Sequence, residues 1–233
     1  MIVLGIDDTD VAGTPGTNQL ARLIVSQLGL LGRGSVITRH QLFFDPRVPY
    51  TSGNGSASIQ LPYGEEIPRS QLIDRVRRVM RGWYVEGSDP GLAVAERSAP
   101  AIDAFAARAK TQVVSQDEAR DVAADAGCYL EGLGGTNQGI IGALSAIALA
   151  CGRDDGRVVH IDGWPWPDHL TGVQPVATIR QRVTDIRLTT GEPFAGDRID
   201  LGKHLRPNWR AGRIVLLVEP APPGETPRAA RLK

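Results

Sequence analysis

Apolar and polar stretches alternate along the chain in a way that predicts a mixed α/β fold opening with a strand and a helix. Residues 1–6 form an apolar run followed at once by polar turn residues, which is typical of a buried strand whose end delivers side chains to a crevice. In residues 18–31 the apolar positions repeat at spacings of three and four, so one face of a helix belongs to the core. We predict that Thr17 is the N-cap of this helix.

The same criteria divide the rest of the chain into strands, helices and three regions. Further strands are predicted at residues 36–44, 55–61, 91–95, 158–161 and 214–218, and further helices at residues 68–80, 100–110, 115–126 and within 134–151. The last of these helices is apolar on nearly every side and must therefore be buried. Residues 1–165 form the main region, residues 166–219 a small β-rich region, and the proline-rich residues 220–233 a tail that we predict to be mobile.

Composition narrows the classes of protein that fit. The chain has 233 residues, 42% of them hydrophobic and 22% charged, which is ordinary for a globular protein in water. Its 26 basic and 26 acidic residues balance, so no global field favours nucleic acid, although a local basic face could still bind it. Two cysteines, Cys128 and Cys151, exclude a disulfide framework and a zinc ribbon. The N-terminus resembles neither a signal peptide nor a membrane span, which favours the cytoplasm.

Three aspartates follow directly after the first predicted strand. Asp7, Asp8 and Asp10 lie within four positions, where their charges repel unless a cation or a set of donors compensates them. Magnesium binds oxygen ligands and is usually shared between one or two carboxylates and substrate phosphates. We therefore predict Asp7 and Asp8 as magnesium ligands. The alternative is that these aspartates serve only as turn and cap residues.

Glycine-rich segments are the second candidate for ligand binding, because glycine lets a ligand approach the backbone closely. Gly16, Thr17 and Asn18 open a helix, whose N–H groups and dipole favour phosphate. Two further loops place amide side chains among glycines, and Arg39 and Arg47 flank the first of them; the loops contain Gly53, Asn54 and Gly55, and Gly135, Thr136, Asn137 and Gly139. A helix cap, a tight turn and exposed arginines are the corresponding structural alternatives.

Three stretches of the sequence resemble the kinase-like part of the archaeal tRNA(Ile2) agmatinylcytidine synthetase (agmatidine synthase) family. They are Gly5-Ile6-Asp7-Asp8-Thr9-Asp10 with Thr17, residues 45–50 running to Gly53-Asn54-Gly55, and residues 139–144. The resemblance implies that Asp7, Asp8 and Asp10 bind magnesium and phosphate, that Thr17 lies by the phosphates and can become phosphorylated, and that Asn54 lines the same site. It further implies a kinase-like nucleotide-binding unit in residues 1–165 with a ferredoxin-like α+β unit around residues 66–126.

The sequence also departs from this family. Full-length members add a nucleic-acid-binding barrel and a cysteine-rich zinc ribbon that hold tRNA, and residues 50–53 lack the basic residues expected before Gly-Asn-Gly. We therefore interpret the chain as a shortened, stand-alone relative. The expected activity is phosphoryl transfer, as in a kinase or a ligase that activates a carbonyl, with ATP and Mg²⁺ and with a small molecule rather than tRNA as acceptor. A homodimer is compatible with the sequence.

Two other functions fit parts of the sequence. Asp8-Thr9-Asp10 is also the pattern of phosphatases with an aspartate nucleophile, for which Lys110 and the pair Asp154-Asp155 would supply the remaining groups. A nucleotide- or RNA-binding module without turnover is the other alternative.

Overall fold

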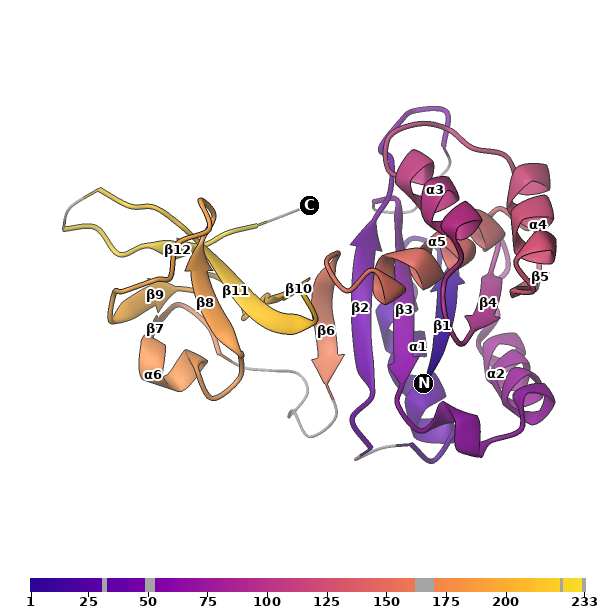
Figure 1. The fold of residues 1–233 in the computed structure, drawn as a ribbon, viewed down its shortest axis with the longest axis horizontal. Helices are drawn as coiled ribbons and strands as arrows, with labels where there is room; N and C mark the ends of the chain where they lie inside the picture. Colours follow the sequence, from indigo (N-terminus) through magenta and orange to yellow (C-terminus); the bar gives the residue numbers. More distant parts are fainter. Residues whose placement is uncertain (31–32, 49–52, 162–169, 223, 232–233) are drawn as a thin grey trace.

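Residues 2–95 form a β-α-β-β-α-β unit in the computed structural model, which describes residues 1–30, 33–48, 53–161, 170–222 and 224–231 (Figure 1). Its elements are β1 (Ile2–Asp7), α1 (Thr17–Gln27), β2 (Val36–Gln41), β3 (Gly55–Leu61), the 3₁₀ turn η1 (Gly64–Glu66), α2 (Arg69–Trp83) and β4 (Gly91–Ala95). The strands are antiparallel and lie in the order β4-β1-β3-β2. This chain order is that of a ferredoxin-like unit. The unit therefore begins at β1, whereas the placement expected around residues 66–126 includes only α2 and β4 of it.

Alternate residues of these strands belong to two hydrophobic cores, because successive side chains point to opposite faces of a sheet. Leu4 and Ile6 of β1 pack with apolar residues of α1 and α2 on one face. Val3 packs on the other face with three further helices, α3 (Pro100–Ala109), α4 (Gln116–Asp125) and α5 (Gly139–Cys151). The short strand β5 (Tyr129–Gly132) pairs with β4 at the edge of the sheet.

Helix α5 lies directly against the centre of the sheet, and glycines allow this close approach. A Cβ atom on Gly5 of β1 would lie 1.9 Å from the carbonyl oxygen of Ala143, and one on Gly91 of β4 would lie 2.2 Å from the Gly139 backbone. Both distances are shorter than any real contact, so α5 can occupy this position only over glycine. The helix is buried along most of its length, as its uniformly apolar sequence predicts.

The C-terminal part extends the same sheet beyond β2. Its elements are β6 (Arg157–Ile161), β7 (Val173–Pro175), α6 (Val176–Ile179), β8 (Asp185–Leu188), β9 (Arg198–Asp200), β10 (Asn208–Arg210), β11 (Arg213–Glu219) and β12 (Arg228–Ala229). Strand β6 pairs with β2 on one side and with β10 on the other. Beyond β10 the neighbouring strands of the sheet are, in order, β11, β12, β9 and β7. This part has a core of its own, which includes Ile186, Leu216 and Val218.

The mixed α/β class predicted from the sequence is confirmed, and several elements differ in detail. Gly16, not Thr17, is the N-cap of α1, and Thr17 is the first residue of the helix. Ser115 caps α4 by accepting a hydrogen bond from the Glu118 amide. The segment of residues 220–233, for which we predicted a mobile tail, contains β12, which pairs with β11 and β9.

Some predicted features fall on residues outside the described ones. They are Leu31 at the expected end of the first helix, residues 49–52 of the long loop, residues 166–169 of the β-rich region and the last two residues of the tail. Within the described ranges, no helix is long and apolar enough to cross a membrane.

Candidate functional site

A pocket of about 680 Å³ lies where β1 ends and where α1 and α5 begin. It brings together most of the residues predicted from the sequence: Asp7, Asp8, Asp10, Gly16, Thr17, Asn18, Arg39, Gly53, Asn54, Gly55 and Gly139. Its volume is in the range of small-molecule and cofactor sites. Segments that are far apart in the sequence therefore meet at the end of the first strand.

Asp7 and Asp8 carry carboxylates whose charged forms are disfavoured. Burial, followed by the Asp8 carboxylate, raises the pKa of Asp7 to about 7. Burial, followed by Asp89 and Asp10, raises the pKa of Asp8 to about 6. Asp8 has a φ of 52°, in the left-handed region that aspartate tolerates better than most residues, and its amide donates to Asp7 Oδ1 over 2.8 Å. A bound cation would stabilise both carboxylates.

Asp10 has a different role from its two neighbours because it caps helix α1. Its Oδ1 accepts hydrogen bonds from the Thr17 amide over 3.2 Å and from the Thr17 hydroxyl over 3.0 Å. The Thr9 hydroxyl in turn donates to Thr17 Oγ1 over 3.0 Å. The cap interpretation of the acid cluster therefore applies to Asp10, and the side chain of Thr17 is held at the rim of the pocket.

The N-terminus of α5 reaches the Asp7 carboxylate. A Cβ atom on Gly142 would lie 1.7 Å from Asp7 Oδ2, so only glycine leaves room for this carboxylate. Gly139, Ile141 and Gly142 all line the pocket, as do Thr17 and Asn18 of α1. Two helix N-termini therefore face the same cavity, and the positive ends of their dipoles favour an anion there.

Arg39 and the Gly53-Asn54-Gly55 loop form the opposite wall. The guanidinium of Arg39 donates to Gln41 Oε1 over 3.3 Å and to the Gly53 carbonyl over 3.4 Å, and a Cβ atom on Gly55 would lie 2.5 Å from its Nη2. Asn54 Nδ2 donates to the Phe43 carbonyl over 2.7 Å, so this amide holds the loop closed. Arg47 also lines the pocket, but its guanidinium is paired with Asp45.

Gly135, Thr136 and Asn137 do not line the pocket, although the sequence predicted them as ligand-binding residues. Their loop is fastened to Asp89, whose carboxylate accepts from the Thr136 amide and, over 2.8 Å, from the Thr136 hydroxyl. The Asp89 carbonyl also accepts from the Gly139 amide over 3.0 Å. The loop therefore positions the start of α5, and of its residues only Gln138 and Gly139 reach the cavity.

Sequence reasoning missed a third wall of the pocket, formed by residues 112–117, which connect α3 to α4 and begin α4. It also missed Phe43 and Val48 as lining residues. The Ser115 cap is the only local signal in residues 112–117, and it indicates a helix start rather than a site. Lys110, which the phosphatase alternative requires near Asp8, instead pairs with Asp155, and neither of these two residues lines the pocket. The arrangement therefore gives the phosphatase alternative no support.

The donor set fits magnesium only together with a ligand. Among the residues that the structure describes, no group of three or more His, Cys, Asp or Glu side chains is arranged to hold a metal ion. Asp7 and Asp8 supply two carboxylates, and magnesium typically completes its shell with water and substrate phosphate oxygens. The residues present therefore fit a magnesium ion that is shared with a phosphate.

The fold and the site define a ferredoxin-like α/β unit with an acidic pocket at the end of its first strand. Solved structures of tRNA(Ile2) agmatidine synthetase (TiaS) are similar to this chain. The TiaS–tRNA(Ile2)–ATP complex matches with 28% identity and a TM-score of 0.53, over 63% of this chain and 36% of that one. The TiaS–tRNA(Ile2)–AMPCPP–agmatine complex matches with 27% identity and a TM-score of 0.50, over 63% and 35%.

A third similar structure is that of a tRNA fluorescent labeling enzyme, with 29% identity and a TM-score of 0.52 over 63% of this chain and 35% of that one. The resemblance to the agmatidine synthetase family predicted from the sequence is thus confirmed. The chain spans about a third of the length of these proteins. No model of a protein family matches the sequence, and no curated protein matches it.

Proposed function

We propose that this protein is an ATP-dependent phosphoryl-transfer enzyme and that its reaction takes place in the pocket at the end of β1. The observation that carries the proposal is the pair Asp7 and Asp8, two carboxylates with raised pKa values that lie beside the N-termini of α1 and α5. A phosphate with a shared cation would satisfy both the carboxylates and the helix dipoles. The similar TiaS structures that contain ATP or AMPCPP support ATP as the nucleotide.

The acidic, basic and helix-terminal groups of the pocket have proposed roles. Asp7 and Asp8 hold magnesium, which when bound offsets the negative charge of the phosphates. Backbone N–H groups near Gly16 and Asn18 bind phosphate oxygens, and Arg39 faces them from the opposite wall. Because the Gly139 amide already donates to the Asp89 carbonyl, α5 acts on the phosphate through its dipole.

Thr17 presents a hydroxyl as an acceptor oxygen. This hydroxyl donates to Asp10 Oδ1 over 3.0 Å, so the Asp10 carboxylate is placed to take up its proton. Transfer of the γ-phosphoryl group to the Thr17 oxygen would break its bond to the bridging oxygen of ATP, release ADP and leave a phosphorylated side chain at the rim of the pocket. A module that binds nucleotide without turnover would form no such product.

The final acceptor has two candidates. We propose a small molecule, because the volume of the pocket is typical of small-molecule sites. An RNA acceptor is the second candidate, since two of the similar structures are complexes with tRNA(Ile2). In either case the acceptor must reach the same end of β1.

Calorimetry with ATP and Mg²⁺ tests the proposal. Asp7→Asn is expected to weaken ATP binding in the presence of Mg²⁺ by at least about tenfold, the loss of roughly 1.4 kcal/mol, while Asp125→Asn, an exposed acid on α4, leaves it unchanged. Thr17→Ala is expected to abolish incorporation of labelled phosphate into the protein, and Thr17→Ser to retain it. Absence of ATP binding by the unmodified protein would refute the proposal, and binding without any phosphate transfer would favour the module that lacks turnover.

A further inference from the structure

Two arginines face each other across neighbouring strands at the place where the two parts of the sheet meet. The register of β2 and β6 pairs Arg39 with Arg157, so both side chains lie on the same face of the sheet. Like charges directly opposite each other in a sheet are destabilising. A bound anion would therefore stabilise this pairing.

A third arginine joins the pair from the segment that leads into β10. The Pro207 carbonyl accepts from the Val158 amide over 2.9 Å, and Asn208 of β10 is in register with Arg157. This pairing brings Arg206 to the same edge, where its Nε donates to His204 Nε2 over 2.8 Å. We name Arg39, Arg157, Arg206 and His204 the basic cluster.

The basic cluster has little compensating negative charge among the described residues, where the Asp7 carboxylate acts on Arg39. No carboxylate of the described chain forms an ion pair with any of its three arginines. Each of the three is only partly exposed. Burial, followed by Arg206 and Arg39, lowers the pKa of Arg157 to about 10. Burial, followed by Arg206 and Arg157, also lowers the pKa of His204. An anion at this position would relieve the repulsion.

The basic cluster continues from the pocket. Arg39 lines the cavity, and burial lowers its pKa while the Asp7 carboxylate acts in the opposite direction. Arg157 is its neighbour on the next strand, and Arg206 lies beyond it, toward the C-terminal part. A molecule that occupies the pocket could therefore extend across β2 and β6 onto these arginines.

We propose that Arg157, Arg206 and His204, together with Arg39, bind a phosphate group carried by the acceptor. Arginine forks match the tetrahedral oxygens of phosphate and bind them through paired N–H groups, which makes phosphate a better fit than a small monovalent ion. The inference rests on the proposed function, because it assigns a substrate class to the molecule that enters beside ATP. The phosphate is either a phosphomonoester of a small acceptor or a phosphodiester of RNA.

The test uses two probes on the full chain: a nucleoside 5′-monophosphate and a short single-stranded RNA without a terminal phosphate. Arg157→Gln and Arg206→Gln are each expected to weaken binding of one probe by about tenfold, a loss of roughly 1.4 kcal/mol. The matched control is Arg75→Gln, which removes an exposed arginine of α2. This control changes the net charge by the same amount as the two test variants. Because Arg75 does not belong to the basic cluster, binding of both probes should stay within about twofold of that of the unmodified protein. The probe that loses affinity identifies the source of the phosphate.

Thermal unfolding separates binding from folding. Because Arg157→Gln removes a like charge from the cluster, its unfolding midpoint should equal or exceed that of the unmodified protein at low salt. A fall in the midpoint together with the loss of binding would overturn the inference, as would unchanged affinity of both variants for both probes. If the unmodified protein binds ATP but the variants bind the probes normally, only this inference fails. If Arg157→Gln weakens binding of a probe while the unmodified protein does not bind ATP, only the proposed function fails.

Discussion

At the scale of single residues, three aspartates of one short segment have three different environments. Asp10 accepts two hydrogen bonds from Thr17 and thereby caps a helix. Asp7 accepts from the Asp8 amide and lies against the start of α5, and Asp8 occupies a left-handed backbone conformation. Asp7 and Asp8 have raised pKa values, which is a frequent property of functional sites. The charge pattern alone does not distinguish the cap from the two candidate ligands.

The raised pKa values predict a pH dependence of stability. The folded protein keeps the Asp7 proton up to about pH 7, whereas an unfolded aspartate loses it near a pKa of 3.8. In this window the folded state binds more protons, so the free energy of unfolding should fall as the pH rises, by at most about 1.4 kcal/mol per pH unit for each group. Added Mg²⁺ should therefore raise the unfolding midpoint more at pH 8 than at pH 5. Urea unfolding at both pH values, with and without Mg²⁺, measures this.

Asp7→Asn provides the comparison for this experiment. It removes the titrating group, so its stability should vary less between pH 4 and pH 7, and its response to Mg²⁺ should be smaller. Asp125→Asn should behave like the unmodified protein. A profile that is the same for Asp7→Asn and the unmodified protein would contradict the assignment of the raised pKa to Asp7.

At the scale of elements, glycines decide how closely α5 approaches the sheet. A Cβ atom on Gly5 would overlap the Ala143 carbonyl oxygen, which belongs to the helix backbone and cannot rotate away. Gly5→Ala should therefore displace α5 and lower the free energy of unfolding by about 1–3 kcal/mol, the usual cost of overpacking. Since the same helix positions Gly139 and Gly142 at the pocket, ATP binding should weaken as well.

Gly82→Ala is the matched control for Gly5→Ala. Gly82 lies on α2, and a Cβ atom there would have no other atom within 4 Å. Alanine at such a helical position should raise the free energy of unfolding by about 0.5–1 kcal/mol, because glycine is the more flexible residue in the unfolded chain. Urea unfolding of the two variants should therefore give changes of opposite sign. Equal destabilisation would show that the close approach at Gly5 is not what limits the packing.

Some elements could be predicted from the sequence because their signals are local. β3 alternates polar and apolar residues, β4 is a short apolar run, and the uniformly apolar sequence of α5 requires burial. By contrast, β9 and β10 have three residues each and form only through their partners in the sheet. The order of strands, and with it the ferredoxin-like unit that begins at β1, depends on pairing between distant segments, which no local pattern encodes.

In the candidate site too, residues with a local sequence signal could be predicted, and contacts between distant segments could not. Asp7, Asp8 and Thr17 could be predicted because they lie together in the sequence, at the end of a strand and the start of a helix. The pairing of Arg39 with Arg157 could not be predicted, because the two arginines are 118 positions apart (157 − 39). Only the register of β2 and β6 brings them together. Gly135, Thr136 and Asn137 form a glycine-rich turn that has a ligand-binding pattern, although their contacts are with Asp89 and the start of α5.

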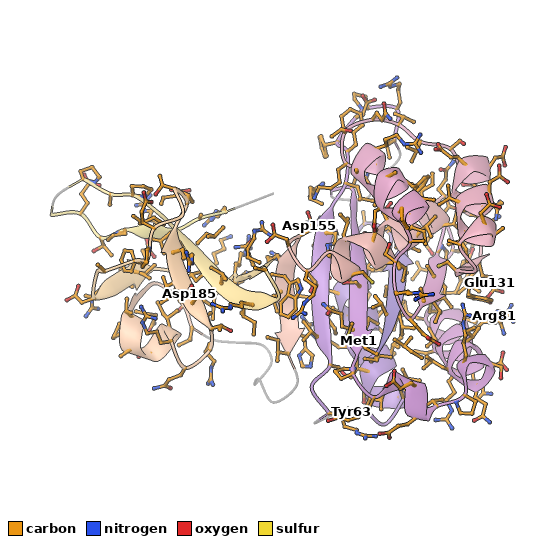
Figure 2. The ribbon with its side chains drawn as sticks, viewed as in Figure 1. Met1, Tyr63, Arg81, Glu131, Asp155 and Asp185 are labelled. Atoms are coloured by element: carbon orange, nitrogen blue, oxygen red, sulfur yellow. The ribbon has the colours of Figure 1, made fainter. Side chains whose placement is uncertain are left out.

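At the scale of the whole molecule, a buried polar network ties the two parts together. His40 of β2 lies between Asp155, whose Oδ1 is 2.9 Å from Nδ1, and Ser58, whose Oγ is 2.8 Å from Nε2. Lys110, just after α3, also pairs with Asp155. Burial lowers the pKa of His40, so the neutral imidazole donates to Asp155 and accepts from Ser58. Asp155 lies where the N-terminal sheet meets the C-terminal part, and its contacts fix the start of β6 (Figure 2).

The separate cores predict that the two parts respond independently to a cavity. Leu216 is fully buried in the C-terminal core, and Leu92 is fully buried in a core of the N-terminal sheet. Leu216→Ala should remove about 2–5 kcal/mol of stability. Because the strands over the C-terminal core are connected to the rest of the sheet mainly where β10 pairs with β6, amides of β8, β11 and β12 should exchange faster while those of β1 and β3 keep their protection.

Hydrogen exchange followed by mass spectrometry measures this response, and Leu92→Ala should give the reverse pattern. ATP binding should survive Leu216→Ala, since the residues that line the pocket lie between positions 7 and 142. Binding of a phosphate probe should weaken, because Arg206 and His204 are carried by the C-terminal part. Faster exchange throughout the sheet in both variants would instead show that the molecule unfolds as one cooperative unit, so that the pocket and the basic cluster depend on both cores.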